Sequence, residues 1–590
     1  MSQLSQQRGN EHTSRLDPWH AAPSTITVRR HVAHVPTSAE ERALPLQQVS
    51  GVLRYDMPKI RARANHKTAS RLKQLLNILF RPPGMPADPQ DASIPGVEVP
   101  RSKRCTPEDC AIRCAAGVIA TVSPSDEEDR PSRAFVNAFS VVELRTPAQD
   151  GASRDRRRAI DHPKAQNEAA YAAGYKSQVD LRHCSSYLGA VYHPCGVVAD
   201  IHASFYGLEL PHNARAYYRF RDSEGNLYEI TRGMMGHTVM AEVQHLITCI
   251  VAGHPDYVQE NFASACPHVD VWIDNVRYTG TRAMVSRARE QLIETSRICN
   301  VAMQCDEVAT KYDFIGIAFD HETHSVRIAD KTLRKLPSSI PTSMTAHELE
   351  GIIGRLIFAA AVRQDPLVNS WWTLKWARRV FNQLNRGVLL TSDVVTLTES
   401  QQRALQYWLT AARLPHVVKR QLQGREATLF TDATLTGWGA VLIFDNDRLL
   451  VAGNHFTGDK AEGDIGRKEA WAVVNALEAF AEQLACVTRL NVFVDNTGVE
   501  AALRRGMPRA ESLVDPIRAT GQHICPSNVS LFVGRVSSEA NPADEISRGQ
   551  RVNIQKIAIG KEYTIAETNL RKGATDSKFA VRVRSFTPLS

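Results

Sequence analysis

The sequence is poor in cysteine and has no long apolar run. Its 11 cysteines among 590 residues are too few for a disulfide framework in a chain of this length, so we expect a reducing compartment. The longest apolar stretch, residues 351–362, contains Arg355 and is too short to cross a bilayer. Residues 1–24 lack the apolar centre of a secretory signal. We therefore expect an intracellular protein, in the cytoplasm or the nucleus, with no membrane segment.

The chain has no overall excess of acidic residues, and its positive charge is concentrated at the two ends. The formal net charge is +8; residues 1–104 contain 16 Lys and Arg against 8 Asp and Glu, and residues 551–590 contain 8 against 3. The region between them is therefore slightly acidic. This distribution is typical of a protein that binds a polyanion and whose chemistry uses carboxylates, although solvated tails would produce the same balance.

The patterns along the chain predict five regions. Residues 1–104 are a basic, partly disordered extension, and residues 551–590 are a basic tail. Between them, residues 105–335 alternate strand and helix patterns, residues 336–420 are mostly helical, and residues 421–550 form a second α/β unit. The expected fold class is therefore multidomain, combining α+β and α/β units.

One helix is expected within the extension. Residues 59–81 contain seven basic residues and no acidic residue, and leucines recur at helical spacing at Leu72, Leu75, Leu76 and Leu79. Such a basic amphipathic helix can bind phosphates or act as a nuclear localisation signal. It can equally pack its apolar side against the rest of the protein.

The first candidate site is a pair of aspartates in apolar strand patterns. Asp200 lies within residues 197–201, and Asp274 follows residues 269–273. A buried carboxylate is costly unless it is paired or bound to a metal ion. If the two strands lie side by side, the pair can hold two Mg²⁺ ions, which activate an attacking hydroxyl and stabilise a leaving pyrophosphate. Any two aspartates at strand ends would share this spacing.

Five segments in this region resemble motifs of reverse transcriptases, in that family's order and spacing. The first aspartate begins a segment similar to the first palm motif. The second lies in a Trp-Ile-Asp-Asn turn, where the family has an aromatic-x-Asp-Asp turn. Residues 155–161 resemble the fingers segment, residues 233–244 the glycine turn before a helix, and residues 312–317 the primer-grip hairpin. The two aspartate segments are residues 200–210 and 272–275.

The resemblance implies a right-hand polymerase, with fingers and palm in residues 105–335 and a helical thumb or connection in residues 336–420. It implies that Asp200 and Asp274 are catalytic metal ligands. It also implies substrate-binding residues: Arg157 and Arg158 at the triphosphate, Phe205 against a ribose 2′-OH, Gly236 at a close backbone approach, and Asn275 in the turn. Asn275 replaces an aspartate of the family. Its amide oxygen can accept a hydrogen bond but brings no charge. Asp200, Asp274 and a backbone carbonyl would still hold the two metals, so we expect polymerase activity to survive.

A second acidic set lies in residues 421–550. Asp432 falls in a strand pattern, Glu469 in an amphipathic helix, Asp495 at the end of a strand, and Asp544 near the start of a last helix. Their order resembles the catalytic carboxylates of ribonuclease H, as do Gly437-Trp438-Gly439 after the first and Asn541 before the last. The resemblance implies that the four converge on two Mg²⁺ ions, for which Mn²⁺ can substitute. The alternative is that they are helix caps and surface acids.

A polymerase followed by ribonuclease H is the arrangement of retroelement reverse transcriptases. The motifs are most similar to tyrosine-recombinase retrotransposons of the DIRS and Ngaro type, especially the VIPER-like and TATE-like elements of trypanosomatids. The resemblance implies that the partners are an RNA template, a DNA primer, an RNA–DNA hybrid and dNTPs, with no membrane. Two alternatives stay open: a ribonuclease H whose palm is inactive, and a decayed or domesticated element product that only binds nucleic acid. The oligomeric state is not specified by these motifs.

Overall fold

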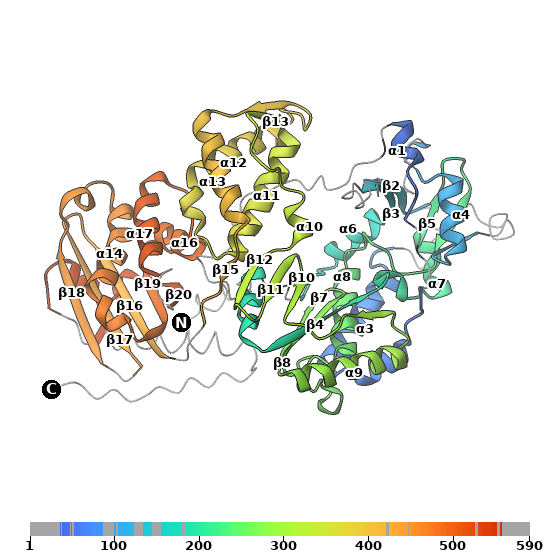
Figure 1. The fold of residues 1–590 in the computed structure, drawn as a ribbon, viewed down its shortest axis with the longest axis horizontal. Helices are drawn as coiled ribbons and strands as arrows, with labels where there is room; N and C mark the ends of the chain where they lie inside the picture. The colour runs from blue at the N-terminus through green and yellow to red at the C-terminus, as the bar shows by residue number, and fades with distance from the viewer. Residues whose placement is uncertain are drawn as a thin grey trace.

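The computed structural model describes residues 36, 38–47, 49, 52–85, 99–101, 104–122, 134–143, 155–179, 181, 183–420, 424–445, 448–524, 529–551 and 555–556. The start of the predicted extension and the predicted tail beyond residue 556 lie outside these residues. Figure 1 shows an α/β unit on the right, a helical unit in the middle and a C-terminal sheet with its helices on the left. No helix in the described part of the chain is long and apolar enough to cross a membrane.

A four-stranded antiparallel sheet with the order β7-β8-β4-β9 forms the centre of the first α/β unit. Its strands are β4 (Cys195–Ile201), β7 (Val269–Trp272), β8 (Asn275–Gly280) and β9 (Met303–Cys305). Helices α8 (Met240–Val251) and α9 (Arg282–Cys299) pack against this sheet. Nearly every side chain of α8 is buried, so this helix lies inside the unit.

Helices α2 (Met57–Arg63) and α3 (His66–Phe80) belong to the same core, although we predicted a separate extension as far as residue 104. Leu72, Leu75 and Leu79 of α3 are fully buried, and α3 packs against α8. The apolar side of α3 therefore packs against the protein, which is one of the three expectations for this segment. The predicted division at residue 104 separates segments that share one core.

The first α/β unit also contains a hairpin and a small antiparallel sheet. The hairpin pairs β2 (Asn137–Glu143) with β3 (Arg156–His162). The small sheet has the order β1-β6-β5, with β1 (Ile119–Thr121), β5 (Arg219–Arg221) and β6 (Leu227–Ile230). The α-helices of this region are α1 (Ala39–Ala43), α4 (Pro107–Ala115), α6 (Lys164–Ala172) and α7 (His212–Arg215).

A second antiparallel sheet and three long helices connect the two α/β units. The sheet has the order β10-β11-β12-β15, with β10 (Lys311–Phe314), β11 (Ile317–Asp320), β12 (Ser325–Ile328) and β15 (His416–Val417). The long helices are α11 (Ala346–Val362), α12 (Trp371–Asn385) and α13 (Glu399–Ala412). Smaller elements are α10 (Asp330–Leu333), β13 (Ser343–Thr345) and β14 (Val394–Thr396). One buried apolar cluster extends from this sheet through the helices into the C-terminal unit.

The C-terminal unit is a five-stranded mixed sheet with the order β18-β17-β16-β19-β20. Its strands are β16 (Arg425–Ala433), β17 (Gly437–Phe444), β18 (Leu449–His455), β19 (Val487–Val494) and β20 (Ser530–Arg535). The first three are antiparallel neighbours, whereas β16, β19 and β20 run parallel. Its helices are α14 (Ile465–Ala479), α15 (Ala481–Leu484), α16 (Thr497–Arg505), α17 (Val514–Ile524) and α18 (Asp544–Ser547).

Candidate functional site

Three carboxylates gather at one edge of the C-terminal sheet. Asp432, Glu469 and Asp495 each offer an oxygen, and these oxygens lie within 4.8 Å of one another. Asp432 and Glu469 are both only 4% exposed, and Asp495 is half-buried. We call this set the three-carboxylate cluster. The three residues span 63 positions of the sequence, with Asp432 on β16, Glu469 on α14 and Asp495 directly after β19, and together they form one acidic site.

The strand order explains why these side chains meet. β16 and β19 are parallel neighbours, and Phe430 pairs with Phe493 in their register. Asp432 and Asp495 each follow their phenylalanine by two residues, so both lie at the same edge of the sheet. Glu469 is carried by α14, which packs against β16 and β17.

Burial and mutual repulsion oppose ionisation within the cluster. Burial raises the pKa of Glu469 to about 9, and the charges of Asp432 and Asp495 add to the rise. Burial also raises the pKa of Asp432 to about 6, although a hydrogen bond from Ser547 partly offsets this. Close carboxylates that cannot all ionise are stabilised by a proton or by a cation.

The cluster has the chemistry of a divalent-cation site. Glu469 Oε2 is buried and has no hydrogen-bond partner among the described residues. Carboxylate oxygens are the ligands preferred by hard cations such as Mg²⁺ and Mn²⁺. A cation among these oxygens would offset their repulsion and give Glu469 Oε2 a partner, so the three residues could bind a metal ion.

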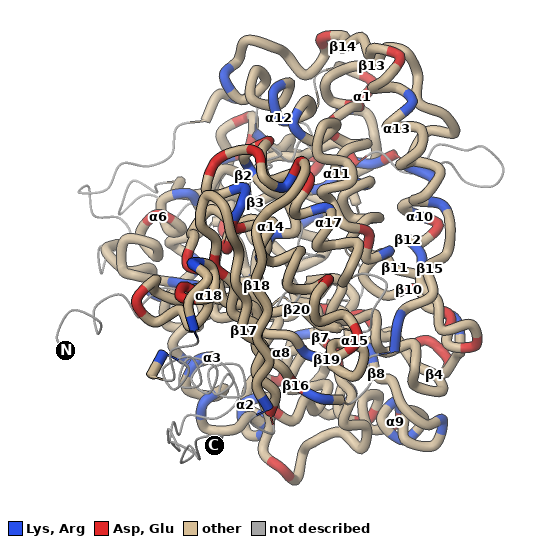
Figure 2. Tube along the Cα trace, turned by 90° about the vertical axis from the view of Figure 1, so that its left-hand side faces the viewer, with Lys and Arg blue, Asp and Glu red and all other residues tan. Residues whose placement is uncertain are grey.

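Asp544 lies near the cluster but is paired with cations. Arg548 donates two hydrogen bonds to its Oδ1, at 2.9 and 3.2 Å, and Lys556 Nζ lies 3.3 Å from its Oδ2. Burial opposes ionisation of Asp544, but the hydrogen bonds and charges of Arg548 and Lys556 outweigh it and hold its pKa below the ordinary value. Figure 2 shows acidic and basic residues close together at α18. The structure thus groups three of the four predicted carboxylates within ligand distance and places the fourth in an ion-pair network.

Glycines of β17 let α18 lie directly on the sheet. A Cβ at Gly439 would overlap the backbone nitrogen of Ser547, and one at Gly437 would lie 2.7 Å from the backbone oxygen of Ser547. Asn541 is fully buried, donates to the backbone oxygen of Thr431 at 3.0 Å and accepts from the backbone nitrogen of Ala543. The two glycines therefore let the end of α18 approach β17, and Asn541 ties the segment before α18 to β16.

Asp200 and Asp274 come together because the turn that carries Asp274 leads into β8, the neighbour of β4. The condition set for the pair, that the two strands lie side by side, is not met, because β8 lies between β4 and β7. Asp274 is in the tight turn from β7 to β8, and Asp200 on β4 pairs with Asn275, the first residue of β8. Burial raises the pKa of Asp200 to about 6, and the nearby charge of Asp274 adds to it.

The turn that carries Asp274 is strained and specifically hydrogen-bonded. Ile273 has a φ of 58°, which is unusual for a β-branched residue and costs about 1–3 kcal/mol. Asp274 accepts hydrogen bonds at 3.0 Å from Ser204 Oγ and from Asn275 Nδ2. Asn275 therefore holds the carboxylate of Asp274 in this structure. Backbone strain of this kind concentrates at functional sites.

The two predicted triphosphate arginines lie on β3 and already have acidic partners. Arg157 makes hydrogen bonds of 2.5 and 2.9 Å with the two carboxylate oxygens of Asp109, and its side chain is largely buried. Arg158 pairs with Glu143 at 3.1 Å and is more exposed. Arg158 is thus the more accessible of the two, whereas Arg157 joins β3 to α4.

The predicted glycine turn packs between the palm-like motif and β3. Gly236 has a φ of 110°, and a Cβ there would overlap the backbone oxygen of Asp161. A Cβ at Gly233 would likewise overlap the backbone oxygen of Phe205. The close approach expected at Gly236 is therefore made to another part of this chain. Phe205 is half-buried in the 3-10 turn Ser204–Gly207, beside the apolar core.

Sequence reasoning missed the serines that contact the carboxylates. Ser547 Oγ lies 2.5 Å from Asp432 Oδ2, and Ser538 Oγ donates to Asp495 Oδ2 at 2.8 Å. Ser204 makes the corresponding contact to Asp274 in the other unit. Ser547 is 115 residues from Asp432 and Ser204 is 70 residues from Asp274, so sequence spacing carries no signal for these contacts.

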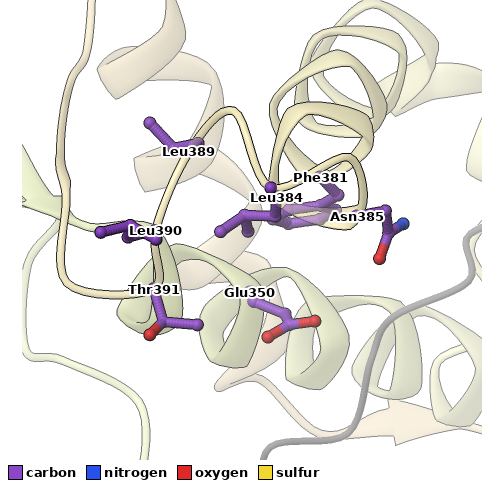
Figure 3. Close-up of a pocket in the computed structure, with 8 residues that line it drawn as sticks. Glu350, Phe381, Leu384, Asn385, Leu389, Leu390 and Thr391 are labelled. Carbon is purple, nitrogen blue, oxygen red and sulfur yellow. The ribbon is translucent and has the colours of Figure 1, made fainter.

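A separate cavity of about 260 Å³ lies in the helical unit, between α11 and the end of α12 (Figure 3). Glu350 of α11 is on one side, and the segment after α12 contributes Leu389 and Leu390 to the lining. The lining residues are Glu350, Phe381, Leu384, Asn385, Gly387, Leu389, Leu390 and Thr391. The candidate carboxylates are not among them, so this cavity is distinct from both acidic sites.

Comparisons with known proteins return only distant structural similarity. No protein-family model matches the chain, and no curated protein does. The solved structures to which it is similar include two complexes of the foamy viral protease-reverse transcriptase with double-stranded DNA. One has 12% identity, covers 83% of both chains and has a TM-score of 0.42; the other has 13% identity, covers 82% of this chain and 96% of that one, also at 0.42. The complex of that protein with RNA/DNA hybrid has 14% identity and a TM-score of 0.40, and the match covers 82% of this chain and 63% of that one.

Similarity at this level establishes neither a family nor an activity for the chain. The fold and site define a mixed α/β multidomain protein with a buried acidic triad that could bind a metal ion.

Proposed function

We propose that this protein is a retroelement reverse transcriptase, with an RNA-directed DNA polymerase site at Asp200 and Asp274 and a ribonuclease H site at the three-carboxylate cluster. The observation that carries the proposal is the presence of two separate acidic sites, each formed by carboxylates from different elements of its own unit. The motifs that resemble the DIRS-type retrotransposons support the same assignment.

In the proposed nuclease site, Asp432, Glu469 and Asp495 hold Mg²⁺ or Mn²⁺ through their facing oxygens. Bound there, the metal would lower the pKa of a water molecule and stabilise the leaving 3′ oxygen. Asp544 lies beside the cluster, and its negative charge is balanced by the side chains of Arg548 and Lys556. An RNA–DNA hybrid would be held mainly through its phosphates, so its binding weakens as salt rises, and its shape and 2′-OH groups distinguish it from DNA duplex.

In the proposed polymerase site, Asp200 and Asp274 are the ligands of the catalytic Mg²⁺ ions. Phe205 follows the first aspartate by five residues and excludes the 2′-OH of a ribonucleotide, so the site selects dNTPs. Arg158 is the better placed of the two arginines to meet the triphosphate, because Arg157 is occupied by Asp109. Ser204 and Asn275 orient the carboxylate of Asp274.

The proposal is tested by two assays on the same purified chain. Primer extension on an RNA template with dNTPs and Mg²⁺ should be lost in Asp200→Asn and Asp274→Asn but retained in Asp432→Asn. Cleavage of a labelled RNA–DNA hybrid should show the opposite pattern. Asp459→Asn, an exposed aspartate of the C-terminal unit, is the matched control and should keep both activities. Equal activity in all variants would refute the assignment.

A second candidate is a ribonuclease H whose palm only binds the hybrid. Asn275 favours it, because this residue brings no charge to a site that has two carboxylates rather than three. So does Arg157, whose guanidinium is already paired. Hybrid cleavage that depends on Asp432, with no extension in either Mg²⁺ or Mn²⁺, would select this candidate.

A further inference from the structure

Ser547 is a buried serine in direct contact with the three-carboxylate cluster. It is 5% exposed, and its Oγ lies 2.5 Å from Asp432 Oδ2 and 2.8 Å from the backbone oxygen of Asp544. Both partners are acceptors and the hydroxyl has one proton to donate. The contact to Asp432 spans 115 residues and is the shorter of the two. A hydroxyl that donates to an ionised carboxylate makes one of the stronger hydrogen bonds found in proteins.

The position of this hydroxyl is set by backbone packing. Ser547 is the last residue of α18, and its backbone lies against Gly437 and Gly439 of β17. Gly453 of β18 gives similar room to Ile546, whose Cγ2 would lie 2.8 Å from an added Cβ. Three glycines on two strands thus fix the height of α18 above the sheet. The Ser547 hydroxyl is therefore presented to Asp432 by a rigid support.

This contact fixes the orientation of the Asp432 carboxylate. Oδ2 is engaged by Ser547, so Oδ1 is the oxygen of Asp432 that this bond leaves available to a bound cation. A free carboxylate rotates about its last bond and must lose that freedom when it binds a metal ion. Hydrogen bonds to ligating carboxylates orient them, and removing such a partner typically weakens metal affinity or activity about 10- to 100-fold.

We propose that Ser547 is a positioning residue that prepares Asp432 to bind the divalent cation. The inference rests on the proposed nuclease function and deepens it, because it adds to the site a residue that touches neither metal nor substrate. Ser547 acts only through Asp432.

The test measures Mn²⁺ binding directly. The parent protein carries Asp200→Asn and Asp274→Asn, so that the polymerase site does not contribute, and Mn²⁺ is titrated by calorimetry. Ser547→Ala should bind Mn²⁺ about 10- to 100-fold more weakly than the parent. Ser547→Cys keeps the size of the side chain with a poor donor and should be weakened as well, whereas Ser547→Thr keeps the hydroxyl and should restore affinity.

The control removes a buried hydroxyl that has no carboxylate partner. Thr520 on α17 is fully buried and donates to the backbone oxygen of Pro516 at 2.9 Å. Thr520→Val should therefore leave Mn²⁺ affinity unchanged. In the hybrid-cleavage assay, Ser547→Ala should raise the Mg²⁺ concentration needed for half-maximal rate by a similar factor, while the rate at saturating Mg²⁺ changes less.

The two levels of the proposal fail differently. If Asp432→Asn removes Mn²⁺ binding but Ser547→Ala and Ser547→Cys bind as tightly as the parent, the role of Ser547 is refuted and the metal site stands. If Asp432→Asn itself binds Mn²⁺ as tightly as the parent, the proposed nuclease site is refuted.

Discussion

The substitution Glu469→Gln should change how the stability of the metal-free protein depends on pH. The pKa of Glu469 is raised from 4.5 to about 9 in the folded chain, chiefly by burial and then by the charges of Asp432 and Asp495. Between these values the folded state keeps a proton that the unfolded state has lost. Stability therefore falls as pH rises, by about 1.4 kcal/mol for each pH unit.

The size of the effect follows from this slope. Between about pH 6 and about pH 8, Glu469 alone should lower the free energy of unfolding by roughly 2–3 kcal/mol. Glutamine has nearly the same shape and does not ionise, so Glu469→Gln should lack this loss. The variant should be more stable than wild type at the higher pH, although it removes a candidate metal ligand.

The assay is urea denaturation in EDTA at the two pH values, followed by circular dichroism. The difference in stability between Glu469→Gln and wild type should grow with pH. Saturating Mg²⁺ should shrink or reverse it, because a ligand that binds only the folded state stabilises that state. Parallel pH dependences for the two proteins in EDTA would refute the reasoning that Glu469 is buried among negative charges.

Three further predictions test the packing and the proposed selectivity. Gly439→Ala should destabilise the protein by about 1–3 kcal/mol and reduce hybrid cleavage, because its Cβ would overlap Ser547; Gly354→Ala, at an open position, is the control, and equal melting temperatures would contradict the prediction. Leu72→Ala should lower the free energy of unfolding by about 2–5 kcal/mol in chemical denaturation, since Leu72 is fully buried. A loss no larger than that from replacing an exposed leucine by alanine would show that α3 does not stabilise the core. Phe205→Ala should raise ribonucleotide incorporation in primer extension, and unchanged selectivity would remove Phe205 from its proposed role.

Local patterns predicted the elements well because they depend on residues close in sequence. The strand pattern around residues 134–144 contains β2, and the apolar runs at Asp200 and Asp274 are β4 and β7. The leucine spacing after residue 70 predicted the buried side of α3. The same patterns did not show which core α3 joins, because a helix with one apolar side can pack against any exposed apolar surface.

The candidate sites were predicted in part. Asp432, Glu469 and Asp495 stood out because their order along the chain resembles that of the ribonuclease H carboxylates, and the structure places them together. The sequence motif could not show that Arg548 and Lys556 pair with Asp544. Nor could it show that Arg157 is paired with Asp109, which precedes it by 48 residues.

The sequence by itself indicated which stretches form strands and helices and that Asp200 and Asp274 need compensation, because periodicity and the cost of burying charge act locally. Only the tertiary structure decided that β8 separates the two aspartate strands, that α3 completes the first core, and that Ser547 reaches Asp432. These features depend on strand order and on helices docking over glycines, and such contacts between distant residues leave no periodic signal in the chain.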